Sequence, residues 1–294
     1  MEYRTLANGV SMPVLGFGTY LLQNKTCTEL VKYAIEQGYE AIDTAQAYEN
    51  EEAVGEGIRQ SGRKRDDVFI TSKIRNRFHG YDNTLMAVEN TLTRMGLEQM
   101  DLFLIHWPGE NMYVPTWKAL VRMYDEGLIR AIGVSNFLPE HMEQAAQATG
   151  RMPMVNQFET HPYLHQYEII DYCKNNDIFP IAWSPLMVGG EVLKNPVILK
   201  IAERYEKTTA QTILRWHLQN GFGIIPKSSH PDRILQNKDI FDFKLTQTEM
   251  KEMDQLTKKQ IRVGDDPATY RFLLLDELKE KKQKLKKDRF GNLM

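Results

Sequence analysis

Short apolar runs alternate with amphipathic segments along most of the chain. The runs are nearly continuous in hydrophobicity, which is typical of parallel strands buried on both faces. The segments between them repeat apolar residues at helical spacing, and several end at a glycine, a frequent residue at helix C-termini. The pattern predicts strands in eight runs: VLGFG (14–18), YEAID (39–43), DVFITSK (67–73), MDLFLIH (100–106), IRAIGV (129–134), MPMVNQ (152–157), FPIAWS (179–184) and GFGIIP (221–226).

The spacing of these runs favours a closed barrel. Residues at or next to the ends of successive runs are 22 to 33 positions apart, except for a last step of 43. They are Gly18, Asp43, Lys73, His106, Ser135, Gln157, Trp183 and Pro226. Eight strand–helix units of this length are typical of a (β/α)8 TIM barrel. An open, doubly wound sheet is the alternative, but the first run continues as GFGTY and lacks the GxGxxG turn of that fold. Asn8-Gly9 separates two short strand-like runs before the barrel, so we expect an N-terminal β-hairpin that closes its bottom.

We therefore expect one α/β domain over residues 1–294, with a charged C-terminal tail. The barrel pattern breaks down near residue 258, and residues 276–290 contain seven basic and four acidic side chains. A solvated terminal helix and a basic interaction tail both fit the composition of the 276–294 segment.

The overall composition excludes several classes of protein. Lys and Arg number 37 against 39 Asp and Glu, so the formal net charge of −2 gives no general attraction to nucleic acid or to an anionic membrane. No run approaches 18 apolar residues and the N-terminus has no signal-like apolar segment, so we expect a cytoplasmic protein. Two cysteines are too few for a disulfide scaffold.

Polar side chains stand at or just after the ends of six of the apolar runs. The C-terminal ends of barrel strands converge on one mouth, where the active sites of this fold lie. We therefore expect one shared site that contains Asp43, Lys73, His106, Ser135 with Asn136, Gln157 and Lys227.

Asp43, Lys73 and Tyr48 predict an acid–base group. A carboxylate buried at a strand end needs a partner, which Lys73 can supply, although Asp43 can also cap a loop and Lys73 can also reach solvent. The pKa of a tyrosine is about 10 in water, and a nearby ammonium lowers it, so Tyr48 beside Lys73 is expected to act as a general acid. A packing role for Tyr48 is the alternative. His106 is expected at the same mouth, where it orients a substrate carbonyl or shares in proton delivery. A hydrogen-bonded histidine of the core, without a role in chemistry, is the alternative.

A second cluster, at residues 224–237, is suited to phosphate. Lys227, Ser228, Ser229 and Arg233 lie just beyond the eighth run, at the start of a predicted short helix. Two cations, two hydroxyls and a helix N-terminus form an anion site, and barrels commonly bind phosphate in this corner. A polar loop with ordinary helix caps is the alternative. No metal site is predicted, because the chain contains no HExxH motif.

The ordered motifs of the chain resemble those of the aldo-keto reductase family. The segment GYEAIDTAQAYENE (38–51) is similar to the family signature around its catalytic aspartate and tyrosine. Seven further segments follow in the family's order: LGFGTY (15–20), ITSKI (70–74), LIHWP (104–108), IGVSNF (132–137), VNQFE (155–159), AWSPL (182–186) and IPKS with its following arginine and asparagine (225–237). The resemblance covers residues 3–257. It implies a (β/α)8 barrel that reduces aldehyde and ketone carbonyls with NADPH and without a metal.

The resemblance also implies a role for each matching residue. Tyr48 would donate the proton, and Asp43 and Lys73 would tune the pKa of Tyr48. His106 would position the carbonyl. Trp183 would stack on the nicotinamide ring. Tyr20 and Trp107 would line the substrate site with Tyr48 and His106. The cofactor would also contact Thr19, Asp43, Ser135, Asn136, Gln157, Ser184, Leu186, Lys227, Ser228, Arg233, Gln236 and Asn237, with Lys227, Ser228 and Arg233 on the 2′-phosphate.

The chain departs from the family pattern in its loops. Gln236 stands where many NADPH-preferring members carry glutamate, and Tyr20 stands where aldose reductase has tryptophan. The segment after His106 is short, as in bacterial and protozoal members, and the charged tail is expected to replace the family's long specificity loop. Methylglyoxal and 2,5-diketogluconate are substrates that suit this short-loop subgroup.

Two other functions fit the predicted fold. The first is a cofactor-binding regulatory subunit, like the channel β-subunits that share the barrel. The second is an isomerase or aldolase with Lys73 as a Schiff base, although an adjacent aspartate keeps a lysine protonated and poorly nucleophilic. For the reductase we expect a small-molecule carbonyl substrate, no nucleic-acid or membrane partner, and a monomer or weak dimer.

Overall fold

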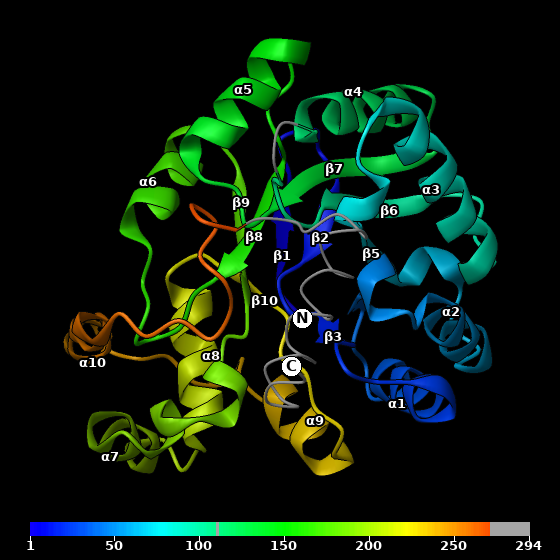
Figure 1. The fold of residues 1–294 in the computed structure, drawn as a ribbon. Helices are drawn as coiled ribbons and strands as arrows, with labels where there is room; N and C mark the ends of the chain where they lie inside the picture. The colour runs from blue at the N-terminus through cyan, green and yellow to red at the C-terminus, as the bar shows by residue number, and fades with distance from the viewer. Residues whose placement is uncertain (110–111, 271–294) are drawn as a thin grey trace, which may run out of the picture.

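In the computed structural model, which describes residues 1–109 and 112–270, eight parallel strands form one curved sheet (Figure 1). Their order in the sheet follows the chain from β3 to β10, with every neighbouring pair parallel. The strands are β3 (Phe17–Gly18), β4 (Ala41–Asp43), β5 (Phe69–Ile74), β6 (Met100–Ile105), β7 (Ile129–Ser135), β8 (Val155–Glu159), β9 (Phe179–Trp183) and β10 (Gly223–Ile224). The predicted tail at 276–294 lies outside the described residues.

The sheet closes between its first and last strands. Leu15 pairs in parallel with Ile224, and the backbone N–H groups of Gly16 and Gly18 donate to the carbonyl oxygens of Ile224 and Pro226 at 2.9 and 3.1 Å. Gly18 is required at this seam, because a Cβ there would lie 2.9 Å from the carbonyl oxygen of Ile225. The predicted (β/α)8 barrel is confirmed, and the open-sheet alternative is wrong.

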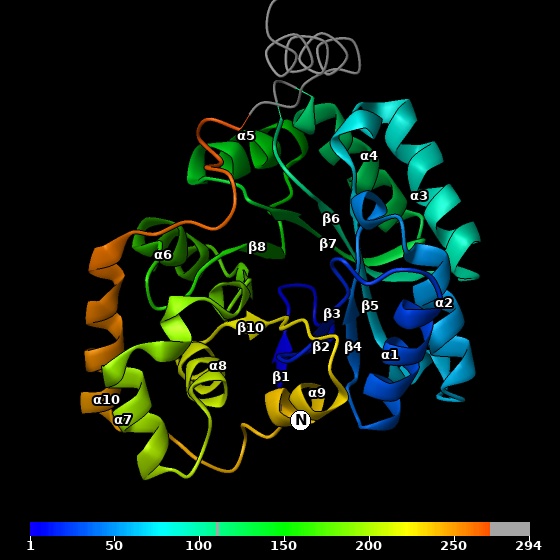
Figure 2. The same ribbon diagram turned by 60° about the horizontal axis from the view of Figure 1, so that its bottom comes forward.

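Helices cover the outside of the barrel (Figures 1 and 2). One helix follows each strand from β3 to β8, as predicted, whereas two lie between β9 and β10 and account for the long step before the eighth strand. The helices are α1 (Asn24–Glu36), α2 (Glu51–Gln60), α3 (Tyr81–Met95), α4 (Tyr113–Asp125), α5 (Pro139–Thr149), α6 (Tyr167–Asn175), α7 (Pro196–Arg204), α8 (Thr209–Gln219), α9 (Pro231–Lys238) and α10 (Gln247–Asp254). None of the helices in the described ranges has both the length and the apolar composition that crossing a bilayer requires.

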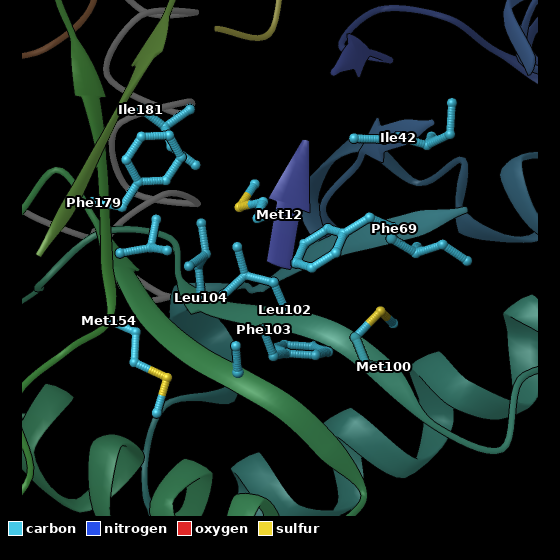
Figure 3. Packing of buried hydrophobic residues seen from close by; sticks show 14 of the residues in the cluster. Met12, Ile42, Phe69, Met100, Leu102, Phe103, Leu104, Met154, Phe179 and Ile181 are labelled. Carbon is cyan, nitrogen blue, oxygen red and sulfur yellow. The ribbon is translucent and has the colours of Figure 1, made fainter. Parts of the chain in front are cut away.

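An N-terminal hairpin closes the bottom of the barrel. The strands β1 (Tyr3–Thr5) and β2 (Ser11–Pro13) pair in antiparallel fashion. Met12 of β2 is buried and lies among side chains from several barrel strands (Figure 3), and it lines one small space with Ile42 and Ile181. The apolar core thus extends from the strands onto the hairpin, as expected.

Residues 255–270, which we call the C-terminal strap, run along the rim of the barrel mouth. The strap begins with the 3₁₀ helix Gln255–Lys259 and passes α6 in both views (Figures 1 and 2). The N–H of Ile261 donates to the carbonyl oxygen of Tyr163 at 3.2 Å, and Tyr270 stacks on Trp107 with ring centroids 4.3 Å apart. The expectation that the charged tail replaces a specificity loop falls on residues outside the described ranges. The strap, which precedes that tail, borders the mouth at Trp107.

Candidate active site

The C-terminal ends of β4 and β5 and the middle of β8 bring Asp43, Lys73 and Gln157 into one buried group. Lys73 Nζ lies 2.5 Å from Oδ1 of Asp43 and donates to the carbonyl oxygen of Thr44 at 2.9 Å. The other carboxylate oxygen of Asp43 accepts from Nε2 of Gln157 at 2.8 Å. Burial lowers the pKa of Lys73, and the Asp43 carboxylate opposes that effect. A buried charge is tolerated only when it is paired and hydrogen-bonded, and both charges of this pair meet that condition. The predicted Asp43–Lys73 pair is therefore confirmed.

Tyr48 lies next to this pair, in the 3₁₀ turn Gln46–Tyr48 that follows β4. Lys73 Nζ is 5.2 Å from the centre of its ring. The ring also packs edge-on against His106, with centroids 5.7 Å apart, and against Tyr20, with centroids 5.1 Å apart. The structure therefore brings together the four residues that the sequence singled out for chemistry.

The pKa of Tyr48 shifts in the direction opposite to our expectation. Burial first, and the Asp43 carboxylate second, raise the pKa of the phenol well above its ordinary value. Lys73 was expected to lower it, but its ammonium is paired with Asp43 and the phenol is poorly solvated. The Tyr48 hydroxyl is therefore protonated at neutral pH, as a proton donor must be.

His106 is a neutral imidazole at neutral pH. Burial lowers its pKa well below the ordinary value, and the nearby charges of Lys73, His79 and Arg75 act in the same direction. A neutral imidazole carries one N–H donor and no extra proton. A neutral His106 can therefore donate one hydrogen bond to a ligand, and its role in the reaction stays a prediction.

Polar residues at the end of β7 hold Trp183 of β9. Asn136, in the left-handed region with φ 60°, accepts from Nε1 of Trp183 at 2.7 Å through its Oδ1. Its Nδ2 donates to the carbonyl oxygen of His106 at 3.0 Å and to Oγ of Ser135 at 3.1 Å. Ser135 in turn donates to the carbonyl oxygen of Gln157 at 2.8 Å. An aromatic ring and a set of amide and hydroxyl groups thus share one edge of the mouth with the Tyr48 group.

The loop after Trp183 leaves one polar atom available. The hydroxyl of Ser184 is buried and has no hydrogen-bond partner among the described residues. Ser184 itself has φ 49°, and Met187 and Val188 have φ 49° and 54°, conformations that non-glycine residues rarely adopt. A buried hydroxyl without a partner next to Trp183 fits a ligand that contains hydrogen-bonding oxygens.

The second predicted cluster lies after β10. Lys227 and Arg233 are exposed, and neither forms an ion pair with an acidic side chain in the described part of the chain. Ser228 is buried, and its Oγ accepts from the N–H of His230 at 3.0 Å just before α9. On α9, Gln236 is exposed and Asn237 is buried. The N-cap residue of α9, His230, makes no side-chain capping bond, and two cations without an acidic partner in the described residues lie beside this helix start, an arrangement that fits a phosphate group.

Other predicted residues support or border the reacting group. Thr19 is buried and donates to the carbonyl oxygen of Asp43 at 2.9 Å. Tyr20 is 57% exposed, and Leu186 is half-buried. Sequence reasoning missed Tyr270, which stacks on Trp107, because it lies beyond the last motif. No group of three or more His, Cys, Asp or Glu side chains that could hold a metal ion is present within residues 1–109 and 112–270.

Comparisons with known proteins agree on one family. The model of the aldo/keto reductase family matches residues 14–258. Glyoxal reductase of Bacillus subtilis is 51% identical over 268 residues, which cover 91% of this chain and 96% of that protein. Methylglyoxal reductase of Yersinia pestis is 40% identical over 268 residues, which cover 90% of this chain and 96% of that protein. A Gox0644 mutant solved in complex with NADPH is 40% identical, with a TM-score of 0.88 over 92% of this chain and 99% of that one.

Proposed function

This chain belongs to the aldo-keto reductase family, and we propose that Tyr48 is the proton donor of its reaction and His106 the residue that orients the carbonyl. The protein is an NADP-dependent oxidoreductase that reduces carbonyl groups with NADPH. One observation carries the proposal: the Tyr48 ring packs against His106 and lies 5.2 Å from the ammonium of the buried Lys73–Asp43 pair.

The residues present fit NADPH. Within residues 1–109 and 112–270, the buried hydroxyl of Ser184 has no hydrogen-bond partner and Lys227 and Arg233 have no acidic partner, which suits a ligand with phosphate groups at two separate points. When bound, NADPH supplies the hydride for the carbonyl carbon. Trp183 would provide the surface for its nicotinamide ring, and Ser135, Asn136 and Gln157 would hold the carboxamide. Ser184 and Leu186 would lie along the pyrophosphate. Gln236 and Asn237 would lie near the adenine, and Lys227, Ser228 and Arg233 would hold the 2′-phosphate.

The charge states of the Tyr48 group suit proton delivery to the carbonyl oxygen. As the carbonyl is reduced, its oxygen becomes strongly basic and takes the proton of the Tyr48 hydroxyl. The Lys73 ammonium, 5.2 Å from the ring centre, stabilises the phenolate that remains. Asp43 holds that ammonium in place, and Gln157 in turn donates a hydrogen bond to Asp43. The neutral His106 donates a hydrogen bond to the same oxygen and selects the orientation of the substrate.

We propose that small 2-oxoaldehydes such as glyoxal and methylglyoxal are the substrates. Two relatives carry these activities in their names. Tyr20 and the stacked Trp107 and Tyr270 offer aromatic walls beside the reacting group. A second carbonyl makes the reacting one more electrophilic, so a small dicarbonyl needs little binding energy from remote contacts.

A substrate panel tests this proposal directly. The value of kcat/KM for methylglyoxal is expected to exceed that for a bulky cyclic ketone by at least about tenfold, or 1.4 kcal/mol in transition-state binding. The measurement is NADPH oxidation at several concentrations of each substrate. Equal kcat/KM values would contradict the substrate class, and NADPH binding with no turnover of any carbonyl would favour the regulatory-subunit alternative.

Arg233→Ala is expected to weaken NADPH binding by about ten- to a hundredfold, since a lost charge-assisted hydrogen bond costs roughly 1.5–3 kcal/mol. NADH, which has no 2′-phosphate, should bind almost as before. The measurement is the Kd of each cofactor from fluorescence titration, with Arg233→Lys as the control that keeps the charge. Equal losses for the two cofactors would show that this residue does not contact the 2′-phosphate.

Two expectations stay predictions. The first is that the protein is a monomer or weak dimer. The cytoplasm remains the predicted location.

A further inference from the structure

One buried carboxylate ties the C-terminal strap to the barrel. Glu159 ends β8 and is 1% exposed. Its two carboxylate oxygens accept hydrogen bonds from the backbone N–H groups of Val263 at 2.6 Å and Gly264 at 3.0 Å. Burial raises the pKa of Glu159, but the bonds from His161, Val263 and Gly264 outweigh it, so the net shift is downward. An ionised carboxylate that accepts two backbone hydrogen bonds is a strong anchor.

This anchor stands directly beside Trp183. Glu159 and Trp183 are paired residues on the neighbouring strands β8 and β9, so their side chains leave the sheet on the same face. Gly264 packs against the indole: a Cβ at this position would lie 2.5 Å from Cη2 of Trp183 and 3.4 Å from Oε2 of Glu159. Any side chain at residue 264 must therefore displace the indole or the strap.

The indole is thus held at two points. Asn136 accepts from Nε1 in the five-membered ring, and the Gly264 backbone lies against the outer atoms of the six-membered ring. With the Asn136 bond alone, the ring could still pivot about that bond. A binding surface that must be ordered during association costs affinity, so the second contact favours binding.

We propose that Glu159 is a positioning residue: it holds the Val263–Gly264 backbone against Trp183 and thereby fixes the indole for the nicotinamide ring. The inference rests on the proposed stacking role of Trp183. The strap then has a function in cofactor binding in addition to lining the substrate site. The strap residues concerned, Val263 and Gly264, follow the part of the chain that the family model matches.

Glu159→Gln tests the anchor, because its amide oxygen can accept only one of the two N–H groups. Hydrogen–deuterium exchange of the peptide that contains Val263 and Gly264 is expected to become faster in the full-length protein without cofactor. The Kd for NADPH is expected to rise about tenfold. The matched control is Glu168→Gln, which changes an exposed glutamate on α6 and should alter neither value.

Gly264→Ala tests the contact itself and keeps the carboxylate intact. The added methyl group is expected to raise the Kd for NADPH about tenfold in the wild-type background. In a Trp183→Phe background the same change should have little further effect, because phenylalanine lacks the outer indole atoms that the methyl group meets. A double-mutant cycle on Kd measures this coupling.

The outcomes separate this inference from the proposed function. If Trp183→Ala leaves the Kd for NADPH unchanged, the stacking role fails and the inference fails with it. If Trp183→Ala weakens binding but Glu159→Gln and Gly264→Ala do not, the strap is only structural and this inference alone is overturned. Faster exchange, weaker binding and a non-additive cycle together support it.

Discussion

Tyr48→Phe is expected to lower kcat for carbonyl reduction by about 10²–10⁴-fold, the usual contribution of a positioned general acid. The substitution removes the hydroxyl and keeps the ring that packs on His106 and Tyr20. Burial and Asp43 raise the pKa of this phenol, so the wild-type protein holds the proton at neutral pH and the variant has none to give. The Kd for NADPH should change little, because no proposed cofactor contact is lost.

Steady-state kinetics with methylglyoxal and fluorescence titration with NADPH measure the two quantities separately. Tyr33→Phe, which removes a phenol from the outer helix α1, is the matched control and should behave as wild type. A Tyr48→Phe enzyme with wild-type kcat would remove Tyr48 from the mechanism, provided that chemistry limits turnover. A large rise in the Kd for NADPH would instead point to a binding role.

The sequence predicted the barrel and the buried pair because both depend on local pattern. Nearly continuous apolar runs have few arrangements other than parallel strands under helices, and the ends of adjacent strands must meet at one mouth. Asp43 and Lys73 end such neighbouring strands, so their pairing followed from topology. The strands predicted from the first and last apolar runs, 14–18 and 221–226, were too long. The observed strands β3 and β10 have two residues each, at the seam where the barrel closes.

Two features could not be predicted because they depend on contacts between distant segments. The direction of the pKa shift of Tyr48 depends on how deeply the phenol is buried and on the second charge beside Lys73. The strap has no apolar period, and its anchor is a pair of backbone N–H groups on the Glu159 carboxylate. Every residue except proline has a backbone N–H, so the side chains of residues 263–264 do not indicate that these donors bond to Glu159. The glutamate itself stood in the motif VNQFE, but nothing local indicated its partner.

Lys73→Met is expected to have two large effects with one cause. It removes the ammonium that stabilises the Tyr48 phenolate, so kcat should fall by about a hundredfold or more. It also leaves the Asp43 carboxylate buried without its cation, and breaking a buried pair in this way costs about 3–5 kcal/mol in the free energy of unfolding. Denaturant unfolding and steady-state kinetics measure the two effects on the same preparation.

Adding Asp43→Asn to Lys73→Met separates the effect on folding from the effect on chemistry. The double variant has no uncompensated charge, and its asparagine oxygen can still accept from Nε2 of Gln157, so most of the lost stability should return. The value of kcat should stay low, because the phenolate still lacks its cation. If kcat recovered together with stability, the ammonium of Lys73 would serve the fold and not the proton transfer. If stability did not recover, the hydrogen bonds that Lys73 Nζ donates, including the one to the carbonyl oxygen of Thr44, would matter more than the balance of charge.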